Sequence, residues 1–192
     1  MRFTRVMGRI LLGIVTLSAV SPAATKRCIE DRYHEAGLLL DAGRYAEALI
    51  VYKEALKEDG VLDGKKRSRI FNNIGYCHYK LDDLDAAIDY YRQALEIDTD
   101  YAVCLNNMAV VLMNQKRYKD ALPYLERADL IQKNVKILFN LFSAHYYLDN
   151  RKEALAYIKD AFRLDEDYTE DRLKKKNISR EDIDRLKKYI RD

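Results

Sequence analysis

The chain has 192 residues, of which 48% are hydrophobic and 34% are charged, so its composition is that of a folded domain rather than a disordered chain. It contains two prolines, seven glycines and no tryptophan, and its many Ala, Leu, Lys and Glu residues favour helix. The 34 basic and 31 acidic residues give a net charge of +3. This surplus is too small to indicate nucleic-acid binding, which needs a concentrated basic face.

Residues 1–23 have the pattern of a signal peptide. Arg2, Arg5 and Arg9 precede an uncharged apolar run at 10–20, and small residues then lead to a predicted cleavage site after Ala23. The run is well short of the ~20 residues that cross a bilayer. We therefore predict an exported protein of the bacterial periplasm or cell envelope, with a retained membrane anchor as the alternative.

Four segments of the remaining chain align with one another. Each has alanine at its first and eighth positions, and the segments begin at Ala48, Ala87, Ala121 and Ala154. The spacings are 39, 34 and 33 residues. A period near 34 with small residues at fixed points indicates a repeat of helix pairs.

The pattern resembles the tetratricopeptide repeat, most specifically in residues 68–101, where Gly75, Ala87 and Ala94 are the small residues and Tyr91 the large one. Small residues let two helices approach closely, and neighbouring pairs stack because one pair cannot bury its apolar face alone. The resemblance implies an all-α, right-handed superhelical solenoid. Within 24–168 it implies four helix pairs, at about 29–62, 68–101, 102–134 and 135–168.

Three departures from the repeat pattern carry their own expectations. The extra residues between the first two repeats, 60–67, are expected to form a longer loop. Pro123 is expected in the first turn of its helix, where its missing N–H costs little. Phe142 stands where a small residue is expected, so either that helix pair is splayed or the register slips and Ser143 takes the small position.

The C-terminal stretch, residues 169–192, is predicted to be a basic linker followed by a capping helix. Ser179 and Asp182 resemble a capping box that opens this helix. The helix would cover the last apolar face of the solenoid. A docking helix for a partner is the alternative.

Signals for catalysis are poor. The chain has no glycine-rich phosphate loop, no nucleophile motif and no closely paired cysteines, and His78 and His145 fall at a packing position of the repeat. We predict no enzymatic activity, no catalytic residues, no metal and no cofactor. Cys77 and Cys104 should lie on neighbouring helices with an axial offset of ~10 Å, too far for a disulfide.

In the family that the chain resembles, the first helix of each pair lines a concave groove. One inward position there carries His34, Asn73, Asn107 and Asn140. An amide offers donors and an acceptor that match a peptide bond, and the series is similar to the asparagine ladder of the O-GlcNAc transferase repeats. The alternative for the amides is a water-covered polar face. Other inward positions carry apolar residues, for which packing between repeats is the alternative: Tyr76, Val110, Met113, Phe139 and Tyr146.

These observations predict an exported adaptor that binds an extended peptide segment of a partner protein in its concave groove. The family's carboxylate clamp is disfavoured, because Tyr33 and Gly37 stand where it needs Lys and Asn. The alternative is a structural subunit of an envelope or membrane-associated complex that assembles through the convex face or the C-terminal helix. No nucleic-acid partner is predicted, membrane association is predicted only if the signal segment is retained, and a homo-oligomer is left open.

Overall fold

The computed structural model describes residues 22–57 and 62–191, and this part of the chain contains ten helices and no strand. In chain order they are α1 (Pro22–Asp41), α2 (Tyr45–Leu56), α3 (Gly64–Lys80), α4 (Leu84–Ile97), α5 (Ala102–Asn114), α6 (Tyr118–Ile131), α7 (Val135–Tyr147), α8 (Arg151–Leu164), α9 (Glu166–Lys175) and α10 (Arg180–Arg191). No helix in this part is long and apolar enough to cross a membrane. The predicted signal peptide lies outside the described residues except for Pro22 and Ala23, which begin α1.

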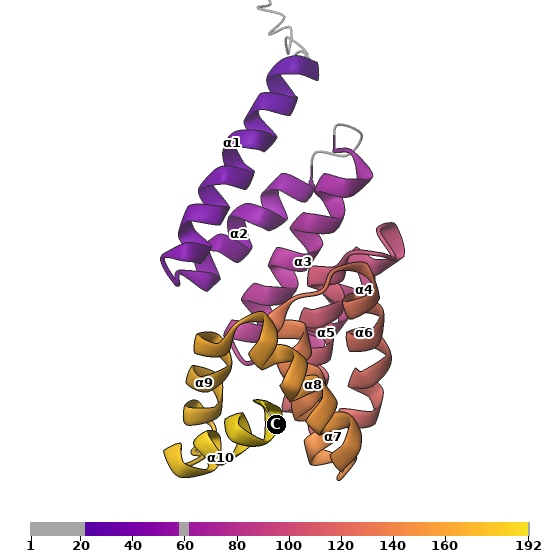
Figure 1. Cartoon of the computed structure of the whole chain (residues 1–192). Helices are drawn as coiled ribbons and strands as arrows, with labels where there is room; N and C mark the ends of the chain where they lie inside the picture. The colour runs from indigo at the N-terminus through magenta and orange to yellow at the C-terminus, as the bar shows by residue number, and fades with distance from the viewer. Residues whose placement is uncertain (1–21, 58–61, 192) are drawn as a thin grey trace, which may run out of the picture.

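The helices form two layers that follow the order of the chain from α1 at one end to α10 at the other (Figure 1). Each helix packs on the next, and the first helices of successive pairs, α3, α5 and α7, also contact one another. These first helices make the inner layer, and α4, α6 and α8 make the outer layer. The architecture is the all-α superhelical solenoid that the sequence predicts.

The turn within each helix pair has the same geometry. Asp82, Lys116 and Asp149 have φ values of 64°, 60° and 58°, in the left-handed region that ends many helices. The N–H of the residue after each of them bonds the carbonyl five residues earlier at 2.9 Å: Asp83 to His78, Arg117 to Leu112 and Asn150 to His145. This recurring turn fixes the repeat register at intervals of 34 and 33 residues.

The fourth helix pair keeps the register that the turns define. Phe142 lies seven residues before Asp149, as Gly75 lies seven before Asp82. The register therefore does not slip, and α7 and α8 are not splayed, because they pack as closely as α5 and α6. Phe142 fits because it packs in a cluster with Ile158, which replaces the larger ring of Tyr91 in the equivalent place.

The connection between α2 and α3 is longer than the later connections between pairs, as predicted, since α2 ends at Leu56 and α3 begins at Gly64. Residues 64–67 belong to α3, and Asp63 caps this helix by accepting a 2.7 Å bond from the Lys66 N–H. Two other local expectations are wrong. Pro123 is the sixth residue of α6, inside the helix rather than in its first turn. The predicted basic linker contains α9, whose N-terminal cap is Asp165.

The C-terminal helix α10 follows the predicted capping box. The Ser179 hydroxyl accepts a bond from the Asp182 N–H at 3.1 Å and donates one to the Asp182 carboxylate at 2.6 Å. Ile183 of α10 is buried in a cluster with residues of α7, α8 and α9. Lys187 forms ion pairs with Glu166 and Glu170 of α9. The two helices thus cover the end of the solenoid together.

Gly75 is the point of closest approach between α3 and α4. A Cβ at this position would lie 2.8 Å from two ring carbons of Tyr91 and 3.2 Å from the Ala87 carbonyl oxygen. Tyr91 is fully buried and cannot move aside without opening the core. The small residue at this position is therefore a packing requirement.

We predict that Gly75→Ala lowers the free energy of unfolding by about 1–2 kcal/mol, because the overpacking exceeds the gain in helix propensity. Urea denaturation followed by circular dichroism measures this. The matched control is Gly37→Ala in α1, where the new Cβ would meet only the Tyr52 hydroxyl at 3.9 Å. The control should be neutral or stabilise by up to about 1 kcal/mol. Equal effects of the two substitutions would contradict this packing.

Candidate functional site: the amide row of the inner layer

Asparagines on the inner layer bond one another from repeat to repeat. The Asn107 amide on α5 donates to Asn72 Oδ1 on α3 at 3.0 Å, and the Asn140 amide on α7 donates to Asn106 Oδ1 on α5 at 2.8 Å. Both bonds join side chains that are buried or half-buried. We call these four asparagines together with Asn73 the amide row.

Asn73 connects the amide row to the first helix pair. Its amide donates to the Tyr52 hydroxyl on α2 at 2.9 Å, and its Oδ1 accepts from Asn72 at 3.2 Å. A continuous relay therefore runs from Tyr52 through Asn73 and Asn72 to Asn107. Burial raises the pKa of the Tyr52 hydroxyl, so this acceptor stays neutral at ordinary pH.

Sequence reasoning found Asn73, Asn107 and Asn140 but missed their partners. Asn72 and Asn106 stand one position earlier, and the oxygen of each accepts a hydrogen bond from the asparagine of the following repeat. The adjacent asparagine pairs 72–73 and 106–107 could have indicated these bonds. Two successive amides on one helix can reach both the preceding and the following helix pair. The row is thus a structural contact between repeats as well as a candidate binding surface.

Part of the amide row remains available for a ligand. Within the described chain, Asn107 Oδ1, Asn140 Oδ1 and Asn106 Nδ2 make no hydrogen bond, and all three residues are half-buried. Asn72 and Asn73 differ, because both atoms of each amide already have partners. The available donor and acceptors lie on α5 and α7, toward the C-terminal half of the solenoid.

Three of the predicted apolar neighbours lie half-buried on the same helices. Tyr76 packs against Tyr45 and Tyr79, with ring centroids 6.3 and 6.2 Å apart. Met113 packs on the main core cluster, and Val110 is half-buried on α5. These side chains thus leave part of their apolar surface exposed on α3 and α5.

Phe139 is wrongly predicted as a groove residue. Its side chain is only 1% exposed, because α9 covers it: the Tyr168 ring packs edge-on at 6.5 Å and the Arg172 guanidinium lies 5.6 Å above it. Phe139 occupies the position of Asn72 and Asn106 in the last repeat. It therefore ends the amide row and anchors the terminal helices.

The structure places His34 and Tyr146 outside the amide row. His34 is exposed on α1 and makes no hydrogen bond in the described chain. Asn73 bonds Tyr52 of α2 instead of His34. Tyr146 is 62% exposed and lines a cavity of about 620 Å³ between α7 and α10. The row thus brings together only part of the predicted set.

His78 and His145 pack against aromatic rings, as predicted. His78 stacks on Tyr90 at 5.2 Å, and His145 stacks on Tyr157 at 5.4 Å. No group of three or more His, Cys, Asp or Glu side chains converges in the described residues.

The cysteines are free, as expected for Cys77 and Cys104, which are both buried. Burial raises the pKa of the Cys77 thiol to about 11 and that of the Cys104 thiol to about 12. Both thiols are therefore protonated at neutral pH and unsuited to nucleophilic chemistry. Cys28 is exposed.

Comparison with known proteins agrees with the geometry. Two models described as tetratricopeptide repeat match residues 32–100 and 78–138, which together cover more than half of the chain. The chain therefore belongs to the tetratricopeptide repeat family.

Among curated relatives, the photosystem I assembly protein Ycf3 of Rippkaea orientalis is 37% identical over 107 residues. The match covers 55% of this chain and 57% of that protein, so the chain spans just over half the length of this relative.

Solved structures share the fold. Pseudomonas aeruginosa PilF superposes with a TM-score of 0.63 at 23% identity, over 74% of this chain and 64% of that one. YrrB, described as a TPR protein with an unusual peptide-binding site, superposes with a TM-score of 0.59 at 19% identity, over 78% and 72% of the two chains. At these identities the likeness concerns the fold alone.

Proposed function

We propose that this protein is a scaffold that binds an extended segment of a partner protein along the amide row. The observation that carries the proposal is the set of free amide atoms on Asn106, Asn107 and Asn140. They offer one donor and two acceptors on adjacent helices of the inner layer. An extended peptide presents N–H and C=O groups in alternation, so it can pair with such a set without a specific sequence.

The amide atoms alone bind weakly. Each net hydrogen bond contributes ~0.5–1.5 kcal/mol, whereas micromolar binding needs about 8 kcal/mol. Tyr76, Val110 and Met113 must therefore contribute apolar contact to side chains of the peptide. The partner segment should be extended, with apolar side chains, rather than acidic.

The names of the curated relatives indicate a kind of role. Two relatives that match about half of this chain are called photosystem I assembly proteins. By analogy, we propose that the partner is a subunit of a larger complex, held in an extended state during assembly. Binding a partner needs no catalytic group, and we retain the prediction that the chain is not an enzyme.

Export is a separate proposal that rests on the sequence pattern of residues 1–23. Cleavage after Ala23 would remove the first two residues of α1, Pro22 and Ala23, and leave the repeats intact. Edman sequencing of the protein purified from its own cells should start at Ala24. A chain that retains residues 10–20 would contradict cleavage at this site.

The binding proposal is tested by site-specific photocrosslinking in the cells that produce the protein. A photoreactive phenylalanine at Val110 of the inner layer should form adducts with a partner, and one at the exposed Ala156 of α8 should not. Asn106→Asp should then reduce the Val110 adducts about tenfold. It keeps the oxygen that accepts from Asn140 but replaces the free amide donor with an oxygen.

The matched control is Asn134→Asp at the N-terminal cap of α7. The same chemical change there keeps the acceptor for the Lys136 N–H, now bonded at 2.8 Å. Both variants should have the melting temperature of the wild type within a few degrees. Adducts at Ala156 only, or Val110 adducts that resist Asn106→Asp, would refute binding along the amide row.

A further inference from the structure

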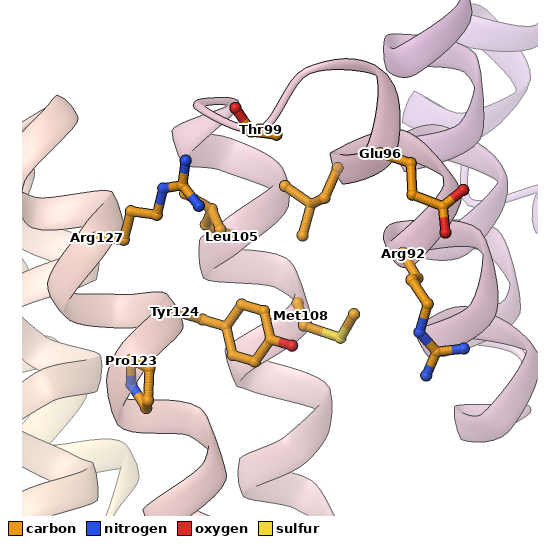
Figure 2. Close-up of a pocket in the computed structure, with 9 residues that line it drawn as sticks. Arg92, Glu96, Thr99, Leu105, Met108, Pro123, Tyr124 and Arg127 are labelled. Carbon is orange, nitrogen blue, oxygen red and sulfur yellow. The ribbon is translucent and has the colours of Figure 1, made fainter.

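A second groove lies on the outer layer, between α4 and α6, with α5 at its base (Figure 2). It consists of two adjoining hollows of about 470 and 490 Å³ that share Arg92, Met108, Pro123 and Tyr124. We call it the outer groove. Its floor is formed by three buried side chains of α5: Leu105, Met108 and Leu112.

A change in the repeat pattern opens the groove at this place. The same position carries a tyrosine in three successive repeats: Tyr90, Tyr124 and Tyr157. The first and third stack on His78 and His145. In the middle repeat Leu112 takes the histidine position. Tyr124 packs against the core cluster but, in the described chain, stacks on no other aromatic ring. Its ring instead points into the outer groove (Figure 2).

Pro123 adds an open acceptor to the groove wall. It lies inside α6 and has no N–H, so the Lys119 carbonyl lacks the donor that would normally come from four residues later. Both residues line the groove. Pro123 therefore costs α6 one backbone hydrogen bond.

The walls of the outer groove carry more basic than acidic side chains: Arg92, Arg117, Lys119 and Arg127 against Glu96 and Asp120. The arginines pair with exposed carboxylates, and exposed pairs of this kind exchange easily with other partners. Lys119 has no ion pair in the described residues. The walls therefore favour an occupant with acidic residues on either side of an apolar strip.

We propose that the outer groove docks an amphipathic helix of a partner protein, with acidic residues flanking its apolar stripe. A helix satisfies its own backbone hydrogen bonds, so it suits a groove with an apolar floor and no side-chain amides. An extended peptide would leave most of its backbone groups unpaired there. This site lies on the opposite layer from the amide row and does not depend on the function proposed for that row.

The walls set the length of the helix. Helices α4 and α6 each have 14 residues, which corresponds to ~21 Å at 1.5 Å per residue. About four turns of a partner helix fit along them. A single ridge of side chains spaced three and four residues apart would enter between the walls.

Fluorescence anisotropy with a synthetic probe tests the outer groove. The probe is a labelled helical peptide of about four turns, with leucines at helical spacing and flanking glutamates. Its twin carries lysines in place of the glutamates. The full chain should bind the acidic peptide saturably and prefer it to the basic twin. Lys119→Glu/Arg127→Glu should weaken acidic-peptide binding at least about tenfold and reverse the preference.

The matched control is Lys152→Glu/Arg163→Glu on α8, which makes the same charge change at exposed positions outside the groove. It should leave the affinity unchanged. The absence of saturable binding, or equal loss in both double variants, would overturn the proposal. So would loss of binding in Asn106→Asp alone, which would place the peptide on the amide row. Analytical ultracentrifugation gives one more contrary outcome. A wild-type dimer that becomes a monomer in Lys119→Glu/Arg127→Glu would assign the groove to a second copy of the chain and overturn the proposal.

Discussion

Hydrogen bonds between amide side chains connect successive repeats of this solenoid on its inner layer. The bonds from Asn107 to Asn72 and from Asn140 to Asn106 join helices that also pack through apolar side chains. Apolar packing is not directional, whereas an amide bond requires one register. The amide row therefore aligns the inner helices, and the free amide atoms lie on two of these helices, α5 and α7.

The two layers of the molecule present different chemistry because the repeat pattern differs between them. The inner layer carries partly unpaired amides, and the outer groove carries an apolar floor between charged walls. A scaffold with two such faces can hold an extended segment and a folded helix at the same time. The terminal helices α9 and α10 limit the inner face, since Phe139 is covered from α9.

Much of the fold followed from the period of the small residues. Gly75 and the buried alanines at 87, 121 and 154 place the helix pairs, because small residues let the two helices of a pair approach closely. The start of α3 and the existence of α9 were missed. Both lie in charged segments without a clear apolar stripe, where a helix depends on capping by Asp63 or Asp165 and on contacts distant in sequence.

The candidate site was predicted in part. The inward position of Asn73, Asn107 and Asn140 follows from the repeat, but their bonding does not, since it depends on distances between helices. Phe139 was misassigned because the covering helix is not visible in the repeat pattern. Tyr124 could not be singled out either. Its place in the groove depends on Leu112, which stands on another helix where two other repeats have the histidine that stacks on the tyrosine.

The most direct test of this account is a double-mutant cycle between Asn72 and Asn107, measured by urea denaturation of the wild type, the two alanine variants and the double variant. If the amide row joins the repeats, the two residues should show a coupling energy of about 0.5–1.5 kcal/mol. A parallel cycle between Asn72 and the exposed Asn114, which bonds only Tyr79, should show additive effects. Additive effects in the Asn72–Asn107 cycle would mean that the amides do not hold the repeats in register, and would contradict the account.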